Sequence, residues 1–271
     1  MISIEGIFER IGLHHPDTTG VAFSGGGAKG LSHIGVIMAM EKFGINPHVI
    51  SGVSAGAIAA VMYGAGLSPL DIRQCFVDYN KFADFREWSL PKDGIFKLDK
   101  FAKILESWLP VRNLEELKIP TVVCATNLEK GAQVGWGKGE IAPRVLASCS
   151  IPVVFKPVKI GDYHFVDGGV IHNLPAWAIR DYCDRLIGCN CSPLDPYKYK
   201  NSILDIALRT YQLGFKANTL QDAKLCDTLV VVRDLTKQKT FDLSSIDYCI
   251  KLGYETACRV FEKDLNSKSR T

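Results

Sequence analysis

The stretch that most constrains the fold of this chain is residues 48–62, which changes from a strand pattern to a helix pattern within a few residues. An apolar run ends at Ser51, Gly52-Val53-Ser54-Ala55-Gly56 follows, and small apolar residues continue to Met62. This order predicts a strand that turns sharply into a helix, with Ser54 on the turn. Glycine suits such a turn because it enters strained backbone conformations at little cost. In this setting Gly-x-Ser-x-Gly is typical of a nucleophilic serine, although the motif alone is equally typical of a loop.

A second strand–loop–helix unit comes before this one. Its strand is Val21-Ala22-Phe23, its loop is Gly25-Gly26-Gly27-Ala28-Lys29-Gly30, and a buried helix is predicted from Leu31 to Phe43. A glycine-rich loop exposes backbone N–H groups, and a helix N-terminus adds the positive end of a dipole. We expect the loop, with donors among Gly25, Gly26 and Gly27 and help from the N–H of Ala55, to form an oxyanion hole beside Ser54.

The same loop also matches Gly-x-Gly-x-x-Gly, the dinucleotide-binding pattern. That pattern requires an acidic residue about 20 positions later, at the end of the second strand. Here this position falls at Ile50-Ser51-Gly52, which contains no acid. A nucleotide site is therefore the weaker interpretation of the loop.

The alternation of strands and helices indicates a parallel sheet with crossover helices, hence an α/β fold. We expect a leader over 1–19, one domain over 20–262 and a polar, frayed tail over 263–271. Within the domain, 67–118 is predicted to be a helical insert. Its aromatic residues are candidates for a lid or an acyl-chain channel, namely Phe76, Phe82, Phe85, Trp88, Phe101 and Trp108. A further helix is expected to begin at 176–182.

Composition excludes several classes of protein. The 271 residues carry a net charge of only +3, and no dense basic run favours nucleic acid. The nine cysteines show no zinc or redox spacing, so we expect reduced thiols in a cytoplasmic protein, with no metal and no cofactor. No stretch predicts a signal peptide or a membrane-spanning helix.

A nucleophilic serine needs a base, and the histidines are poorly placed to supply it. None lies beyond His172, whereas an α/β-hydrolase has its histidine late in the chain. His33 and His48 fit structural roles, and His172 is the one credible rival. Asp167 is better placed, because it ends the strand-like run from Tyr163 and precedes Gly168-Gly169, although Asp-Gly-Gly is also common in plain turns.

Taken together, these motifs resemble the patatin-like phospholipase family. The glycine-rich loop at 25–30, the Gly-x-Ser-x-Gly motif at 52–56 and the Asp-Gly-Gly motif at 167–169 occur in the family's order, and the stretches 147–157 and 173–175 are similar to the family's. The resemblance implies a three-layer α/β/α domain with a mostly parallel sheet. It also implies a catalytic dyad of Ser54 and Asp167 without a histidine. The supporting motif residues are Gly30, Gly52, Gly56, Gly168 and Gly169.

The activity that the resemblance implies is hydrolysis of carboxylic esters of phospholipids or lysophospholipids through an acyl-enzyme on Ser54. The partners are then a lipid or ester substrate and, transiently, a membrane surface that the protein touches from the cytoplasmic side. Two alternatives stay open. One is a transacylase or thioesterase with the same dyad, and the other is a non-catalytic lipid-binding module.

Overall fold

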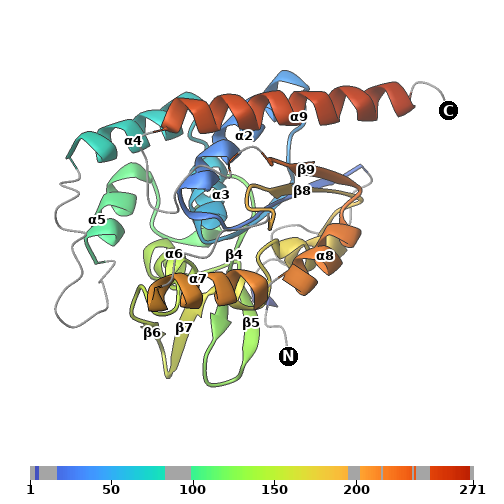
Figure 1. Cartoon of the computed structure of the whole chain (residues 1–271). Helices are drawn as coiled ribbons and strands as arrows, with labels where there is room; N and C mark the ends of the chain where they lie inside the picture. The colour runs from blue at the N-terminus through green and yellow to red at the C-terminus, as the bar shows by residue number, and fades with distance from the viewer. Residues whose placement is uncertain are drawn as a thin grey trace.

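A single mixed sheet organises the chain (Figure 1). The computed structural model describes residues 4–5, 17–82, 99–194, 202–214, 216–233, 235 and 245–268. Along the sheet the strand order is β1-β5-β4-β3-β2-β8-β9, and β7 also pairs with β4 and carries β6. Their bounds are β1 Ile4–Glu5, β2 Thr19–Phe23, β3 Val49–Val53, β4 Thr121–Asn127, β5 Ala132–Trp136, β6 Val158–Ile160, β7 Tyr163–Asp167, β8 Arg185–Asn190 and β9 Thr228–Val231.

The sheet is parallel through its centre and antiparallel at one side. β2 is parallel to both β3 and β8, β3 is parallel to β4, and β8 is parallel to β9. β4 pairs with β5 and β7 in antiparallel fashion. Strands β3 and β4 are buried along their whole length, as expected of strands with helices or loops on both faces. Because parallel strands share an edge at their carboxyl ends, the segments that follow β2, β3 and β8 meet there.

Helices cover both faces of the sheet, which confirms the predicted α/β fold. They are α2 Ser32–Lys42, α3 Ala55–Gly64, α4 Pro69–Phe82, α5 Asp99–Trp108, α6 Ile141–Cys149, α7 Ile203–Gly214, α8 Lys216–Leu225 and α9 Ile246–Lys268. The largest core joins α2, α3 and α9 to one face, and α9 lies along the top of the view across α2 (Figure 1). A smaller core packs residues 174–186 and α8 against the other face.

The helix predicted from Leu31 to Phe43 is present as α2, and a 3-10 turn over Gly27–Leu31 precedes it. Two other predictions are wrong. Residues 176–182 form two 3-10 turns, Pro175–Ala178 and Arg180–Tyr182. The tail predicted from 263 is helical to Lys268, because Asp264 is anchored to the sheet: its carboxylate accepts hydrogen bonds from Thr228 at 2.5 Å and Arg185 at 3.2 Å.

The predicted insert contains α4 and α5, and residues 83–98, including Phe85 and Trp88, lie outside the described residues. Between the two helices, aromatic rings pack against one another. The Trp108 ring centroid lies 5.4 Å from that of Phe76, 6.1 Å from that of Tyr79 and 6.2 Å from that of Phe101. These rings form a small apolar core that joins α4 to α5, so they stabilise the insert whatever else it does.

Candidate active site

Ser54 lies on the turn between β3 and α3 in a strained conformation. Its φ is +54° and its ψ is −123°, a region that residues with a side chain rarely occupy. Strain of this kind persists only where the surrounding structure enforces it, and it is typical of functional sites. The predicted strand–turn–helix is therefore present, with the serine at its sharpest point.

A serine from another element holds this turn in place. The backbone N–H of Ser54 donates to Oγ of Ser148 on α6 at 2.8 Å, and the Ser148 hydroxyl donates to the carbonyl of Cys124 in β4 at 2.6 Å. Ser148 is fully buried. The strained turn is thus tied to both α6 and the sheet through one hydroxyl group.

The motif glycines are explained by close packing around the turn. A Cβ on Gly52 would meet the backbone of Ala57 at 2.6 Å, and one on Gly56 would meet the carbonyl oxygen of Ser24 at 2.6 Å. Gly30 lies directly against the side chain of Ala55. These glycines bring the two strand–loop–helix units into backbone contact, which places the glycine-rich loop beside Ser54.

Asp167 ends β7 opposite Ala125 of β4 and faces the serine. The side chains of Ser54 and Asp167 are hydrogen-bonded to each other. The backbone N–H of Asp167 donates to the carbonyl of Ser150 at 2.9 Å, and its Oδ1 accepts from the N–H of Gly169 at 2.8 Å. A Cβ on Gly168 would lie 2.8 Å from the carbonyl oxygen of Cys124, so the first motif glycine lets this segment approach β4.

The carboxyl of Asp167 is 1% exposed, and this burial raises its pKa to about 6. Three hydrogen bonds act in the opposite direction, from the N–H of Gly169 and the hydroxyls of Ser54 and Tyr211. The result is a carboxylate that is ionised at neutral pH and has a greater proton affinity than an aspartate in water. Such a group is suited to accept the proton of a hydroxyl.

The glycine-rich loop divides into an anchored part and an accessible part. Gly25 is buried, and its N–H donates to the carbonyl of Asn173 at 3.0 Å. That donor is therefore occupied, which corrects the expectation that Gly25 supplies it to an oxyanion. Gly26, Gly27 and Ala55 are partly exposed, and Gly27 has a left-handed φ of +57° that glycine favours. These three residues remain the candidates for oxyanion donors.

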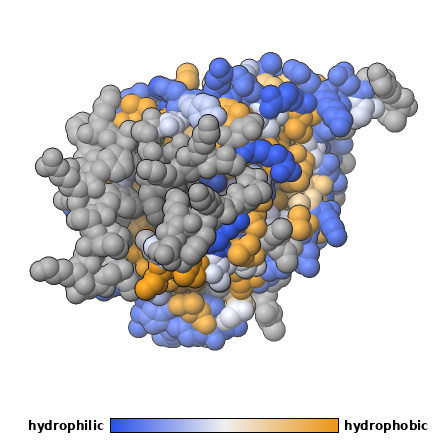
Figure 2. Space-filling view, viewed as in Figure 1, coloured by the Kyte–Doolittle hydropathy of each residue, from blue (hydrophilic) through white to orange (hydrophobic). Residues whose placement is uncertain are grey.

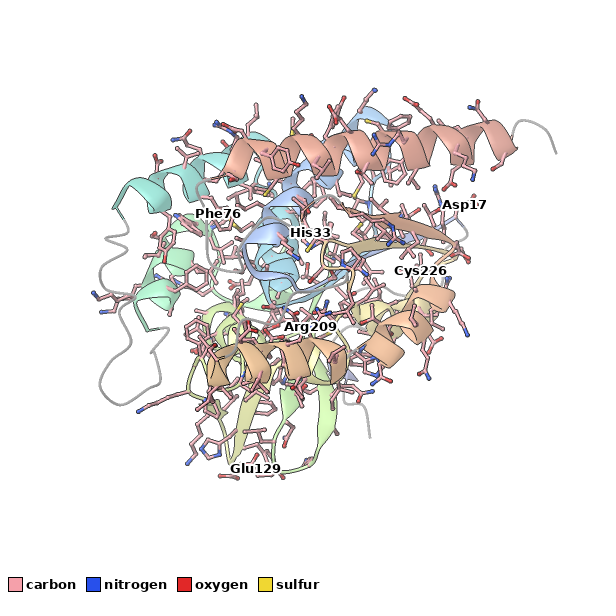
Figure 3. All side chains as sticks on the ribbon, in the orientation of Figure 1. Asp17, His33, Phe76, Glu129, Arg209 and Cys226 are labelled. Carbon is pink, nitrogen blue, oxygen red and sulfur yellow. The ribbon has the colours of Figure 1, made fainter. Side chains whose placement is uncertain are left out.

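Two of the described histidines, His33 and His172, are engaged with partners other than Ser54. His33 of α2 (labelled in Figure 3) is fully buried, its Nε2 lies 2.9 Å from the carbonyl oxygen of Ser24, and burial lowers its pKa to about 4. His172, the rival base, places its Nδ1 2.7 Å from Oδ2 of Asp222 on α8. A neutral His33 supports the loop, and His172 fastens α8 to the segment that follows Asp167.

Sequence reasoning missed three residues of the site. Ser148 holds the turn, and Asn173 anchors the loop by accepting from Gly25 and donating from its side-chain amide to the Gly25 carbonyl at 3.3 Å. Tyr211 of α7 donates to Asp167. Both Ser148 and Asn173 lie in stretches that carry the family resemblance, which was the available signal. Tyr211 lies in a part of the chain without a motif, and nothing local singles it out.

The described residues contain neither a metal-binding cluster nor a membrane-spanning helix. No three His, Cys, Asp or Glu side chains there are grouped as a metal ion would require. In the same part of the chain, every helix is too short or too polar to cross a bilayer.

At this site a strained serine between a strand and a helix faces a buried aspartate, and a glycine-rich loop lies beside both. The family model for patatin-like phospholipases matches residues 21–179, more than half of the chain. The chain therefore belongs to the patatin-like phospholipase family.

Individual relatives are distant. An uncharacterised NTE family protein of Mycobacterium tuberculosis is 27% identical over 158 residues, which are 58% of this chain and 27% of that protein. The uncharacterised protein YqhO of Bacillus subtilis is 28% identical over 67% of this chain and 74% of its own length. The lysophospholipase NTE1 of Candida glabrata is 26% identical over 86% of this chain, but over only 15% of its own length.

Among solved structures, VipD from Legionella pneumophila superposes with a TM-score of 0.56. The match covers 92% of this chain and 68% of VipD at 17% identity, so it supports the fold alone.

Proposed function

We propose that this chain is a lipid acyl hydrolase that cleaves carboxylic ester bonds of phospholipids or lysophospholipids. The observation that carries the proposal is the hydrogen bond between the strained Ser54 and the buried Asp167. Membership of the patatin-like phospholipase family supports the class of substrate, and a distant relative is named a lysophospholipase.

In the first half of the reaction, Oγ of Ser54 attacks the carbonyl carbon of the ester while Asp167 takes the hydroxyl proton. The carbonyl oxygen becomes an oxyanion, which the N–H groups of Gly26, Gly27 and Ala55 stabilise. The tetrahedral intermediate then breaks its bond to the leaving oxygen, and Asp167 gives that oxygen the proton. The products of this half are an alcohol, such as a lysolipid or glycerophosphodiester, and an acyl-Ser54 ester.

In the second half, a water molecule attacks the acyl carbonyl and Asp167 takes a proton from it. The bond to Oγ breaks, the proton returns to Ser54, and a fatty acid leaves. One buried carboxylate therefore serves as base and acid in both halves. Its raised pKa, about 6, suits this work because a general base is most effective when its pKa lies near the working pH.

The substrate class implies transient contact with a lipid surface. Hydrophobic side chains gather over α7 in the lower half of the view (Figure 2). Three large apolar side chains of α7 are exposed, namely Ile203 (86%), Ile206 (50%) and Leu213 (51%). Co-sedimentation with phosphatidylcholine vesicles tests this contact. Ile203→Glu should weaken the binding, whereas Leu70→Glu, at an exposed apolar residue of α4, should not.

An active-site probe tests the dyad. A fluorophosphonate should label the wild type, and Ser54→Ala should lose both labelling and release of fatty acid from lysophosphatidylcholine. Ser51→Ala is the matched control, because Ser51 is a buried serine three residues away whose hydroxyl donates to the carbonyl of Pro175 at 2.8 Å. Absence of labelling in the folded wild type would mean that the protein is not a serine hydrolase and would favour a lipid-binding module.

Product analysis separates hydrolysis from acyl transfer. With water as the only acceptor, free fatty acid should account for the acyl groups that are released. Adding glycerol or another short alcohol should divert only a small part of them to a new ester. If most acyl groups appeared on the alcohol at millimolar concentration, the protein would be a transacylase with the same dyad.

A further inference from the structure

The inner face of α7 reaches the catalytic carboxylate. α7 packs on the 3-10 turn Gly168–Val170 that follows Asp167. Two residues of α7, Leu208 and Tyr211, pack against the loop after α6. The buried apolar residues of this loop that they contact are Ile151, Val154 and Phe155. This small cluster is separate from the two large cores, and its position fixes the Tyr211 ring against the site.

The Tyr211 hydroxyl lies at the Asp-Gly-Gly motif itself. It is hydrogen-bonded to the carboxylate of Asp167, and it occupies the space that a Cβ on Gly169 would need. The second glycine of the motif therefore leaves room for the Tyr211 hydroxyl, which a Cβ at this position would crowd. A tyrosine side chain has only two rotatable bonds before its ring, so a packed ring places its hydroxyl accurately.

Asp167 thus receives donors from three separate elements. The N–H of Gly169 comes from its own turn, the Ser54 hydroxyl from the β3–α3 turn and the Tyr211 hydroxyl from α7. A carboxylate offers about four lone-pair sites, so it can accept all three at once. The serine bond is the one that reacts, and the other two keep the carboxylate in place while it does so.

We propose that Tyr211 is a positioning residue for the dyad, whose hydroxyl holds the Asp167 carboxylate toward Ser54 and favours its ionised form. The proposal rests on the proposed function for its catalytic meaning. It does not come from the family match, which ends at residue 179. A donor to a carboxylate stabilises the charged form over the protonated one, so the proton that Asp167 takes from Ser54 is more readily passed on to the leaving oxygen.

The other titratable group that faces Asp167 among the described residues is Cys149 of α6, which also contacts Ser54. Burial raises the pKa of the Cys149 thiol well above its ordinary value, and burial and the Asp167 charge do the same for the Tyr211 hydroxyl. Both groups therefore stay protonated across the working range. The acid limb of a pH–rate profile should therefore report the ionisation of the Asp167 carboxyl group.

The test compares Tyr211→Phe with the wild type and with Tyr63→Phe. Tyr63 is a partly buried tyrosine at the far end of α3 from Ser54, so its variant controls for loss of a hydroxyl. The readout is kcat/KM for a water-soluble p-nitrophenyl ester between pH 4.5 and 8.5. In Tyr211→Phe, the acid limb should move upward by about one pH unit, because a hydrogen bond to a charged group is worth about a tenfold change in ionisation. At pH values below the acid limb, kcat/KM of Tyr211→Phe should then be about tenfold lower than that of the wild type. At pH 8 the difference should be much smaller.

An unchanged acid limb in folded Tyr211→Phe would overturn the proposal. A second measurement does not depend on turnover: the carboxyl resonance of Asp167, identified in ¹³C spectra by its loss in Asp167→Asn, should titrate at higher pH in Tyr211→Phe. If the wild type hydrolysed no ester, the proposed function would fail, yet this titration would still decide whether Tyr211 acts on Asp167. Equal midpoints in the two proteins would show that it does not.

Discussion

The backbone N–H of Ser54 donates to Oγ of Ser148 at 2.8 Å, so a residue 94 positions away supports the candidate nucleophile. The same hydroxyl donates to the carbonyl of Cys124. Since both partners are buried backbone groups, no solvent can replace the serine if it is removed. The strained turn, α6 and β4 therefore depend on one side chain.

Ser148→Ala should lower both stability and turnover. It leaves two buried backbone groups without a partner, which costs about 1–3 kcal/mol in the free energy of unfolding. Because the Ser54 turn would relax, kcat should fall about tenfold or more while KM changes little. Urea unfolding and steady-state kinetics measure the two effects. Ser51→Ala should lower stability without the loss of kcat, and equal kcat values in the two variants would contradict the role given to Ser148.

Asp167→Asn should abolish turnover and make the folded state less sensitive to pH. Burial raises the pKa of Asp167 from 3.8 to about 6, so between these values the folded state binds more protons than the unfolded state. Stability must then fall as pH rises through this window, by about 3 kcal/mol for a shift of this size. Asp167→Asn has no carboxyl group at this position, so its stability should not fall in this way as pH rises.

The difference in unfolding free energy, variant minus wild type, should therefore increase from pH 4 to pH 7. Urea titrations at several pH values measure it. A difference that stays constant over this range would mean that Asp167 is not held with a raised pKa in the folded protein.

Gly27→Ala should impair the oxyanion hole. Gly27 has a φ of +57°, where alanine is strained by about 1 kcal/mol, and any adjustment of the loop moves its N–H away from the carbonyl oxygen. Loss of one oxyanion donor typically lowers kcat by about 10²–10³-fold.

Gly44→Ala is the matched control for this variant. Gly44 follows α2 with a φ of +65°, and a Cβ there would meet no other atom. Alanine at this position therefore introduces the same kind of backbone strain far from the serine. Both variants should lose similar stability in thermal unfolding, and only Gly27→Ala should lose kcat. Equal kcat values would place the oxyanion donors elsewhere.

His172→Gln should keep most of the activity. His172 is paired with the buried Asp222, and glutamine can still donate to that carboxylate while it cannot act as a base. We expect kcat/KM within about threefold of the wild type, because the bond to Asp222 still holds the segment that follows Asp167.

His172→Ala should instead destabilise the protein by about 1–3 kcal/mol, because it leaves Asp222 buried without this donor. Circular dichroism with urea checks the fold of both variants. A hundredfold loss of activity in a folded His172→Gln protein would restore a histidine-based mechanism.

Local patterns of residues were enough to predict the strand–turn–helix around Ser54, the glycine-rich loop and the α/β class. Each depends on sterics within a few residues: small residues at a sharp turn, apolar runs for buried strands and helical spacing for crossover helices. Asp167 lies 113 positions from Ser54, and the order of the three motifs, which resembles that of the family, was what predicted it as the partner of the serine.

Only the tertiary structure decided how the site is assembled. The N–H of Gly25 is occupied by Asn173, His172 is paired with Asp222, and Tyr211 reaches Asp167 from a helix that carries no motif. Hydrogen bonds and close contacts between distant segments depend on how the chain crosses itself, and they leave no periodic signature along it. For that reason the sequence determined which groups could react, and the packing of α6, α7 and the loop after β7 determined which of them are free, held or buried.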